Sequence, residues 1–172
     1  MLTQSQIKRL KFLHNKKYRQ KEGKILLEGH RLILQALIAD VEIIKVWMAE
    51  DYAESISGRE LKQMLVEKNI VMEMATNKSI GKVCDSKNSQ GIIAVMLLPQ
   101  YAPLQDIPRH SLYFDNISDP GNMGTLLRTA AWFGISSVFL SPGCVDPLNS
   151  KVLRSAMGAH FHLKNLMTVP HD

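Results

Sequence analysis

Apolar and polar positions follow two different periods along the first hundred residues. Short apolar runs predict strands at residues 25–28, 42–48, 70–74 and 91–98. Helical spacing predicts helices at 30–39 and 59–68, a short helix at 77–84 before a polar loop at 85–90, and an opening basic helix anchored by Ile7, Leu10 and Leu13. Alternating strands and helices predict an α/β layered domain.

A second series of elements follows a proline-marked segment that contains Pro99, Pro103 and Pro108. Strands at 111–114 and 137–140 alternate with helices that begin after Asn122 and at 150–159, which predicts a parallel sheet with right-handed crossovers. Because proline disfavours helix and marks linkers, we place the boundary near residue 103, giving domains 1–102 and 103–172.

Both loops of interest in this second series leave the carboxyl ends of strands, where ligands bind in parallel sheets. The turn Asp119-Pro120-Gly121-Asn122 has Pro and Gly in its two central positions, and Asn122 is the expected N-cap of the next helix. In that helix Arg128 lies off the apolar stripe. Gly124 costs up to about 1 kcal/mol relative to alanine, which suggests a close approach by backbone or ligand.

Positive charge is concentrated at one end of the chain. The net charge is +5, yet residues 1–24 hold eight Lys or Arg against Glu22 alone, so the remaining 148 residues are slightly acidic. This asymmetry favours contact with a polyanion, and RNA is the simplest candidate, although a solvated basic helix explains the segment equally well when it is taken alone. The cations expected to face RNA are Lys8, Arg9, Lys11, Lys16, Lys17 and Arg19.

Composition excludes several other classes. Hydrophobic residues make up 45% and charged residues 22%, as in ordinary globular proteins. The apolar run at 92–98 is too short for a membrane span and the N-terminus lacks a signal peptide's apolar region, so we expect a cytoplasmic protein. Cys84 and Cys144 are expected to be reduced core thiols. No zinc-type cluster occurs, and His160 and His162 alternate in an expected strand, which places them on opposite faces.

One stretch is specific enough to indicate a family. Its fixed positions resemble the first signature motif of the SpoU (TrmH-like) RNA ribose 2′-O-methyltransferases of the SPOUT superfamily, and they are Asn116, Asp119, Pro120, Asn122, Gly124, Arg128, Thr129 and Ala130. Residues 151–159, KVLRSAMGA, look like the family's next helix. The opening helix together with residues 24–37, KILLEGHRLILQAL, resembles its substrate-binding domain. The resemblance implies a small α/β RNA-binding domain followed by a parallel-sheet α/β-knot methyltransferase domain. It also implies S-adenosylmethionine as cofactor, ribosomal RNA as substrate with transfer RNA next, and a homodimer.

The resemblance assigns catalysis to Arg128 with Asn122 shaping the site, although Asn122 is equally well explained as a cap. Asn116, Asp119, Pro120, Gly124 and Gly158 are expected to shape the site as well. Helical spacing places Lys151, Arg154, Ser155 and Gly158 on one face, which suits a sugar-phosphate backbone, while an ordinary amphipathic helix is the alternative.

The sequence stops at Asp172, before the two further family motifs that hold the cofactor and form the knot. From the sequence we therefore expect a truncated chain with an incomplete cofactor pocket. Two rival functions remain. One is a non-catalytic RNA-binding protein or an inactive fragment of the enzyme. The other is a nucleotide-binding enzyme, which is weak because neither common glycine-rich phosphate motif occurs.

Overall fold

The computed structural model describes residues 2–101 and 110–170. It divides into two compact units, Met1–Leu98 and Pro99–Asp172, which are taken one at a time below. The boundary predicted near residue 103 lies outside the described residues.

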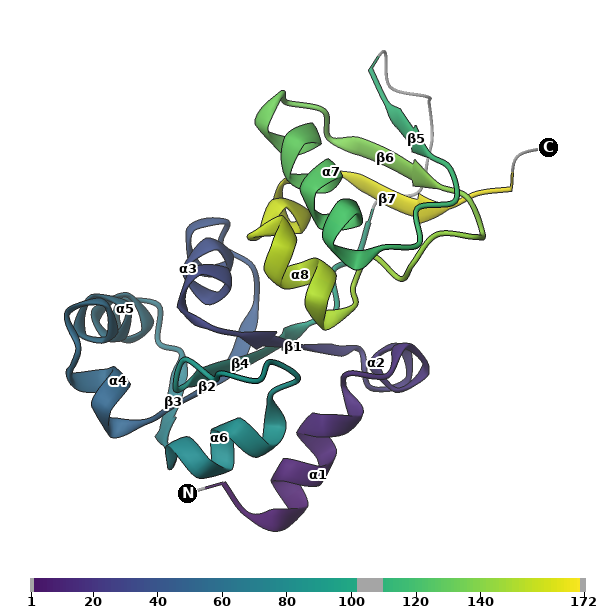
Figure 1. Cartoon of the computed structure of the whole chain (residues 1–172). Helices are drawn as coiled ribbons and strands as arrows, with labels where there is room; N and C mark the ends of the chain where they lie inside the picture. Colours follow the sequence, from purple (N-terminus) through teal and green to yellow (C-terminus); the bar gives the residue numbers. More distant parts are fainter. Residues whose placement is uncertain (1, 102–109, 171–172) are drawn as a thin grey trace. The chain divides into compact units, whose positions relative to one another are not determined.

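The first unit is a four-stranded mixed sheet with helices on both faces (Figure 1). Its strand order is β1-β4-β2-β3, in which β4 runs antiparallel to both β1 and β2 while β2 and β3 are parallel. The elements in chain order are α1 (Gln4–Phe12), α2 (Lys16–Glu22), β1 (Lys24–Glu28), α3 (His30–Ile38), β2 (Ile43–Met48), α4 (Glu50–Glu54), α5 (Ile56–Glu67), β3 (Val71–Met74), α6 (Asn77–Val83) and β4 (Ile92–Leu97). The α/β layers predicted for this region are confirmed, whereas α4 and the separate helix α2 were not foreseen.

The opening helix is divided in two, where a single helix was predicted. Thr3 and Gln6 form a capping box at the start of α1. Asn15 then begins α2, because its side chain accepts hydrogen bonds from the backbone N–H groups of Lys17 and Tyr18. An Asn side chain that caps a new helix makes an elbow at residues 13–15, and the apolar residues of α1 still pack into the core of the unit.

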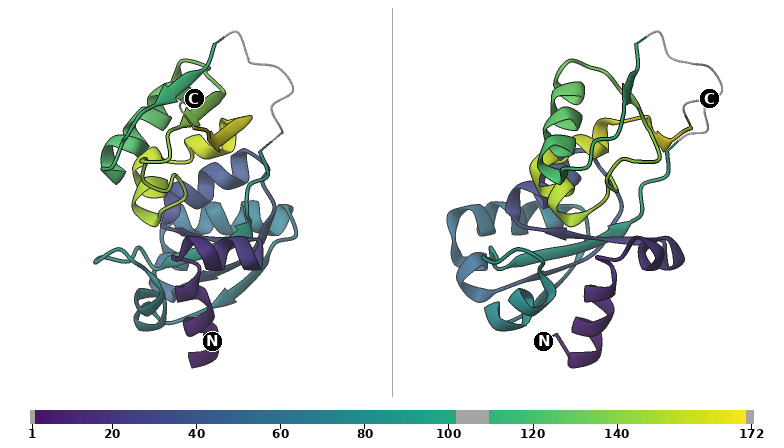
Figure 2. Two further views of the ribbon diagram at one scale, coloured as in Figure 1. Left: turned by 90° about the vertical axis from the view of Figure 1, so that its right-hand side faces the viewer. Right: turned by 45° about the vertical axis from the view of Figure 1, so that its right-hand side comes forward.

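The second unit is a three-stranded parallel sheet of order β5-β6-β7, with α7 and α8 packed against each other (Figure 2). Its elements are β5 (Leu112–Phe114), α7 (Pro120–Trp132), β6 (Ser137–Leu140), α8 (Ser150–Ala156), a 3₁₀ turn η1 (Ala159–His162) and β7 (Asn165–Thr168). The central strand β6 is buried along its whole length. The predicted parallel sheet is therefore confirmed.

Three local predictions in this unit are wrong. Helix α7 begins at Pro120 with Asp119 as its N-cap, because Asp119 Oδ1 accepts the N–H of Asn122 at 2.8 Å. Helix α8 ends at Ala156, since Met157 takes the left-handed conformation. The two histidines lie in η1 rather than in a strand, and β7 follows them. No described helix has the length and apolar character needed to span a bilayer.

Candidate active-site edge

Two loops at the carboxyl end of the parallel sheet are tied together by polar contacts. The backbone N–H of Asn116 donates to Ser141 Oγ at 2.8 Å, and that of Ile117 donates to Cys144 Sγ at 3.3 Å. The thiol of Cys144 in turn donates to the carbonyl of Phe114 at 3.2 Å. These contacts hold the loop after β5 in one position relative to the loop after β6.

Asn116 takes a demanding conformation within this edge. Its φ is 53°, a left-handed value that Asn tolerates better than most residues. A Cβ added to Gly143 would lie 2.5 Å from Asn116 Oδ1, so only glycine at 143 leaves room for this amide. The sequence argument missed Ser141, Gly143 and Cys144. The sequence feature that could have identified them is the run of small residues, including a glycine, directly after a buried strand.

The start of α7 presents Asn122 in a different role from the one expected. Asp119 makes the capping hydrogen bond, so the prediction that Asn122 is the N-cap is wrong. The side chain of Asn122 is exposed. Capping therefore does not account for Asn122, and its amide is open to other contacts. Pro120 occupies the first helical turn, where its missing N–H costs nothing.

Arg128 is exposed on α7, off its buried stripe as predicted. Its Nη1 donates to Met157 Sδ at 3.5 Å, a weak contact with the residue that ends α8. The neighbouring hydroxyls of Thr125 and Thr129 bond instead to carbonyls of their own helix, those of Gly121 and Thr125. The guanidinium thus retains donors for a substrate anion.

Gly124 permits the close contact between α7 and α8. An added Cβ would lie 1.8 Å from Ser155 Oγ and 2.8 Å from the backbone nitrogen of Ala156. The expectation of a close approach at Gly124 is confirmed, and the neighbour is backbone and side chain of α8. Ser155 has its hydroxyl within bonding distance of the Pro120 carbonyl at 3.2 Å and of two carbonyls of α8. It therefore belongs to the helix contact, which corrects its expected place among RNA-facing groups.

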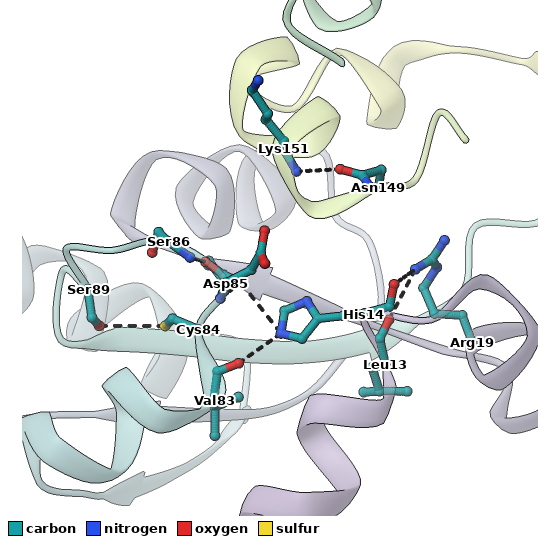
Figure 3. Close-up of polar contacts among 11 residues, drawn as sticks. Leu13, His14, Arg19, Val83, Cys84, Asp85, Ser86, Ser89, Asn149 and Lys151 are labelled. Atoms are coloured by element: carbon teal, nitrogen blue, oxygen red, sulfur yellow. Dashed lines mark hydrogen bonds and ion pairs between the residues drawn. The ribbon is translucent and has the colours of Figure 1, made fainter. Parts of the chain in front are cut away.

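The predicted polar face of α8 is smaller than expected. Lys151 is exposed and Arg154 is half-buried, but Gly158 is buried beyond the end of the helix at φ 89°. Gly158 therefore does not share a face with Lys151. Asn149 caps the helix by accepting the N–H of Lys151 at 2.9 Å (Figure 3).

Among the N-terminal cations, Arg19 has a different role from the other five. Its side chain is only 2% exposed, and Nη1 donates to the carbonyls of Leu13 and His14 at 3.1 and 2.9 Å (Figure 3). The prediction that Arg19 faces RNA is wrong, because its guanidinium satisfies carbonyls at the end of α1. The other five cations predicted to face RNA are exposed, and they are Lys8, Arg9, Lys11, Lys16 and Lys17.

Metal chemistry finds no support in the described part of the chain. Residues 2–101 and 110–170 contain no group of three or more His, Cys, Asp or Glu arranged to hold an ion. His160 is fully buried, and its Nε2 bonds to the carbonyl of Pro147 at 2.7 Å. Burial lowers the pKa of this imidazole to about 4. It is a structural group beneath the second loop.

Two known protein families match this chain, one in each of its two units. Residues 4–94 match the family described as the MRM3-like substrate binding domain, and residues 109–171 match the SpoU rRNA Methylase family. The chain carries an MRM3-like substrate binding domain, and its residues 109–171 belong to the SpoU rRNA methylase family. The SpoU-type residues identified above thus lie on the loops and helices of the candidate edge, from Asn116 to Arg128.

Relatives and solved structures agree with this membership. The chain is 40% identical over 154 residues to rRNA methyltransferase 3A, mitochondrial, of Danio rerio, covering 85% of this chain and 34% of that protein. It is 34% identical over 157 residues to the 23S rRNA (guanosine(2553)-2′-O)-methyltransferase RlmP of Bacillus subtilis, covering 91% of this chain and 59% of that protein. The SpoU methyltransferase AviRb from Streptomyces viridochromogenes, solved with the cofactor AdoMet, shares the fold with a TM-score of 0.81 at 21% identity, covering 98% of this chain and 64% of that one. The SpoU-family chain therefore spans between about a third and two thirds of the length of these proteins.

Proposed function

We propose that the protein transfers a methyl group from S-adenosylmethionine to a ribose 2′-hydroxyl of RNA, and that ribosomal RNA is the substrate. The observation that carries the proposal is the SpoU motif placed on a braced edge. Asn116 is held by Ser141 and accommodated by Gly143, and Arg128 stands exposed on the helix that follows. The names of the relatives, rRNA methyltransferase 3A and RlmP, support the substrate class.

The side chains of this edge are of a chemical type that suits S-adenosylmethionine. Its side chains are amides and hydroxyls such as Asn116, Ser118 and Ser141, groups that hydrogen bond to a nucleoside, and ligands of parallel sheets bind beyond the carboxyl ends of strands. S-adenosylmethionine would supply an electrophilic methyl group carried on a sulfonium. AviRb, which shares this fold, was solved with that cofactor.

Arg128 acts on the acceptor in this proposal. As the ribose oxygen bonds to the methyl carbon, the carbon–sulfur bond breaks and the hydroxyl proton must leave. A guanidinium stays protonated under nearly all protein conditions, so Arg128 does not serve as the base. It clamps the adjacent phosphate through its planar fork and stabilises negative charge on the ribose oxygen, while the phosphate or a water takes the proton. Asn122 orients the same nucleotide.

The N-terminal unit contributes affinity through its charge. The exposed cations of its first two helices neutralise phosphates largely without regard to sequence, which makes binding sensitive to salt. Lys151 and Arg154 on α8 add contacts of the same kind.

The test is incorporation of labelled methyl from S-adenosylmethionine into ribosomal RNA taken from cells that lack the protein. The proposal predicts label that survives alkali in a dinucleotide, because a methylated 2′-oxygen cannot attack the neighbouring phosphate. Label on a base would contradict the ribose assignment. Tight RNA binding with no methyl transfer, from a protein that also binds the cofactor, would favour a non-catalytic RNA-binding protein.

Two further expectations stay predictions. We propose that the protein forms a homodimer, which light scattering of the purified protein would test through its mass. We also propose a cytoplasmic location, which fluorescence microscopy of a tagged protein would test.

A further inference from the structure

The chain turns at an elbow between α1 and α2 (Figure 1), and the residues on either side of this elbow include an aromatic residue and several lysines. Phe12, the last residue of α1, is 45% exposed. Its ring centroid lies 5.1 Å from that of Tyr18, with 41° between the ring planes.

The same elbow contains a pocket of about 290 Å³ lined by Phe12, Asn15, Lys17, Tyr18 and Lys21. Phe12 and Tyr18 contribute two aromatic rings to a mostly apolar lining, which Asn15, Lys17 and Lys21 complete. This composition suits a flat, polar-edged ring attached to a negatively charged chain.

Charge around the pocket is of one sign. None of the described residues that line it is acidic. The nearest acidic residue in sequence, Glu22, lies 3.7 Å from the guanidinium of Arg9, outside this lining. Lys17 and Lys21 are four residues apart on α2, so their side chains share one face of the helix. An anionic ligand is favoured and an acidic neighbour does not compete for the lysines.

The pocket is also preorganised. The side chain of Asn15 accepts the N–H groups of Lys17 and Tyr18 at 2.9 and 3.3 Å, which fixes the first turn of α2. Buried Arg19 of α2 donates to the carbonyls of Leu13 and His14, which follow the end of α1. These contacts join the two helices and set the separation of the two rings before any ligand binds. A rigid site avoids part of the entropy cost of association.

We propose that this pocket binds one unpaired nucleobase of the substrate RNA, stacked on Phe12, with Lys17 and Lys21 on the flanking phosphates. The proposal rests on the proposed function for the identity of the ligand as RNA. Stacking on an aromatic ring with cations along the backbone is the usual way in which proteins hold single strands. A base within a duplex cannot reach the ring, so the site should select loops and unpaired segments.

The test measures binding of the full chain to a short single-stranded RNA that carries one 2-aminopurine. Stacking quenches this base, so fluorescence reports the pocket while anisotropy reports affinity. Phe12→Leu keeps the apolar volume and removes the aromatic face, and Phe12→Trp restores it. Val66→Ala on α5 is the matched control, because Val66 is also an exposed apolar residue of this unit.

For Phe12→Leu we expect about tenfold weaker binding, loss of quenching and an unchanged salt dependence. Phe12→Trp should recover both signals, and Val66→Ala should change neither. Lys17→Gln should weaken binding and reduce the salt slope by roughly one. The duplex form of the same RNA should bind without quenching.

Several results would overturn the proposal. Equal affinity and equal quenching in Phe12→Leu would remove the stacking role and leave the methyltransferase proposal intact. Equal competition by polyglutamate of the same charge would show a surface that recognises charge alone. Absence of single-strand binding in the wild-type chain would also reject the pocket. Methyl incorporation, measured separately, decides the proposed function whichever of these results is found.

Discussion

Replacement of Gly124 by alanine tests the packing that places α7 against α8. The new methyl carbon would lie 1.8 Å from Ser155 Oγ, 2.7 Å from Ser155 Cβ and 2.8 Å from the nitrogen of Ala156. Optimal carbon contacts are about 3.5–4.0 Å, so the helices must separate or Ser155 must rotate. Rotation cannot relieve the contact with the backbone nitrogen of Ala156.

The expected change in the free energy of unfolding combines two destabilising effects with one stabilising effect. Overpacking of this kind costs about 1–3 kcal/mol, and moving the Ser155 hydroxyl weakens its hydrogen bond by roughly 1 kcal/mol. Alanine in a helix interior returns up to about 1 kcal/mol relative to glycine. We therefore expect Gly124→Ala to lower the free energy of unfolding by about 2 kcal/mol.

Urea unfolding followed by circular dichroism measures this change, and hydrogen exchange of α8 amides localises it. Gly81→Ala on α6 is the matched control, because a Cβ there meets nothing within 4 Å and should stabilise slightly. The pair Gly124→Ala with Ser155→Gly should recover part of the loss. Stabilisation by Gly124→Ala equal to that of the control would refute the reasoning about the helix contact.

Three other substitutions or titrations probe separate features. Gly143→Ala should displace the Asn116 amide, because Asn116 Oδ1 would lie 2.5 Å from the new Cβ. We expect methyl transfer to fall at least tenfold while the free energy of unfolding changes little, and retained turnover would contradict this. Arg19→Ala should cost about 2–3 kcal/mol in urea unfolding because two buried carbonyls lose a charged donor, whereas Arg9→Ala, with a largely exposed side chain, should cost under about 1 kcal/mol; equal costs would count against the burial argument. His160, whose pKa burial lowers to about 4, resists protonation when folded, so stability present above pH 6.5 should fall as the pH drops from 6.5 toward 4. An NMR titration of its imidazole near 6.5 would contradict the last prediction.

The sequence predicts best those elements whose pattern is local and strong. Strand β6 is buried along all four residues, and its predicted bounds agree with the structure because a compact apolar run has few alternatives. Strand β7 was missed because it begins with Asn165, whose buried amide oxygen accepts the Ser137 hydroxyl at 2.9 Å. A polar residue that is satisfied by a partner 28 positions away leaves no local signal.

In the site, too, a residue's role could be predicted where it depends on neighbouring residues in the sequence, and not where it depends on distant ones. Arg128 and Gly124 could be placed from helical spacing and from the cost of glycine in a helix. The role of Arg19 could not, because its burial depends on an elbow that Asn15 helps to create and on the carbonyls of Leu13 and His14 within that elbow. Gly143 was missed for a similar reason, since its importance comes from the Asn116 side chain of another loop.

The most direct test of the central claim separates catalysis from binding at Arg128. Arg128→Lys keeps the charge and removes the planar fork, so the account predicts that kcat for methyl transfer to RNA falls at least a hundredfold while RNA affinity changes less than about threefold. Arg9→Lys, on the exposed N-terminal surface, is the control and should change neither quantity strongly. Near-wild-type kcat in Arg128→Lys would contradict the account and remove this guanidinium from the reaction.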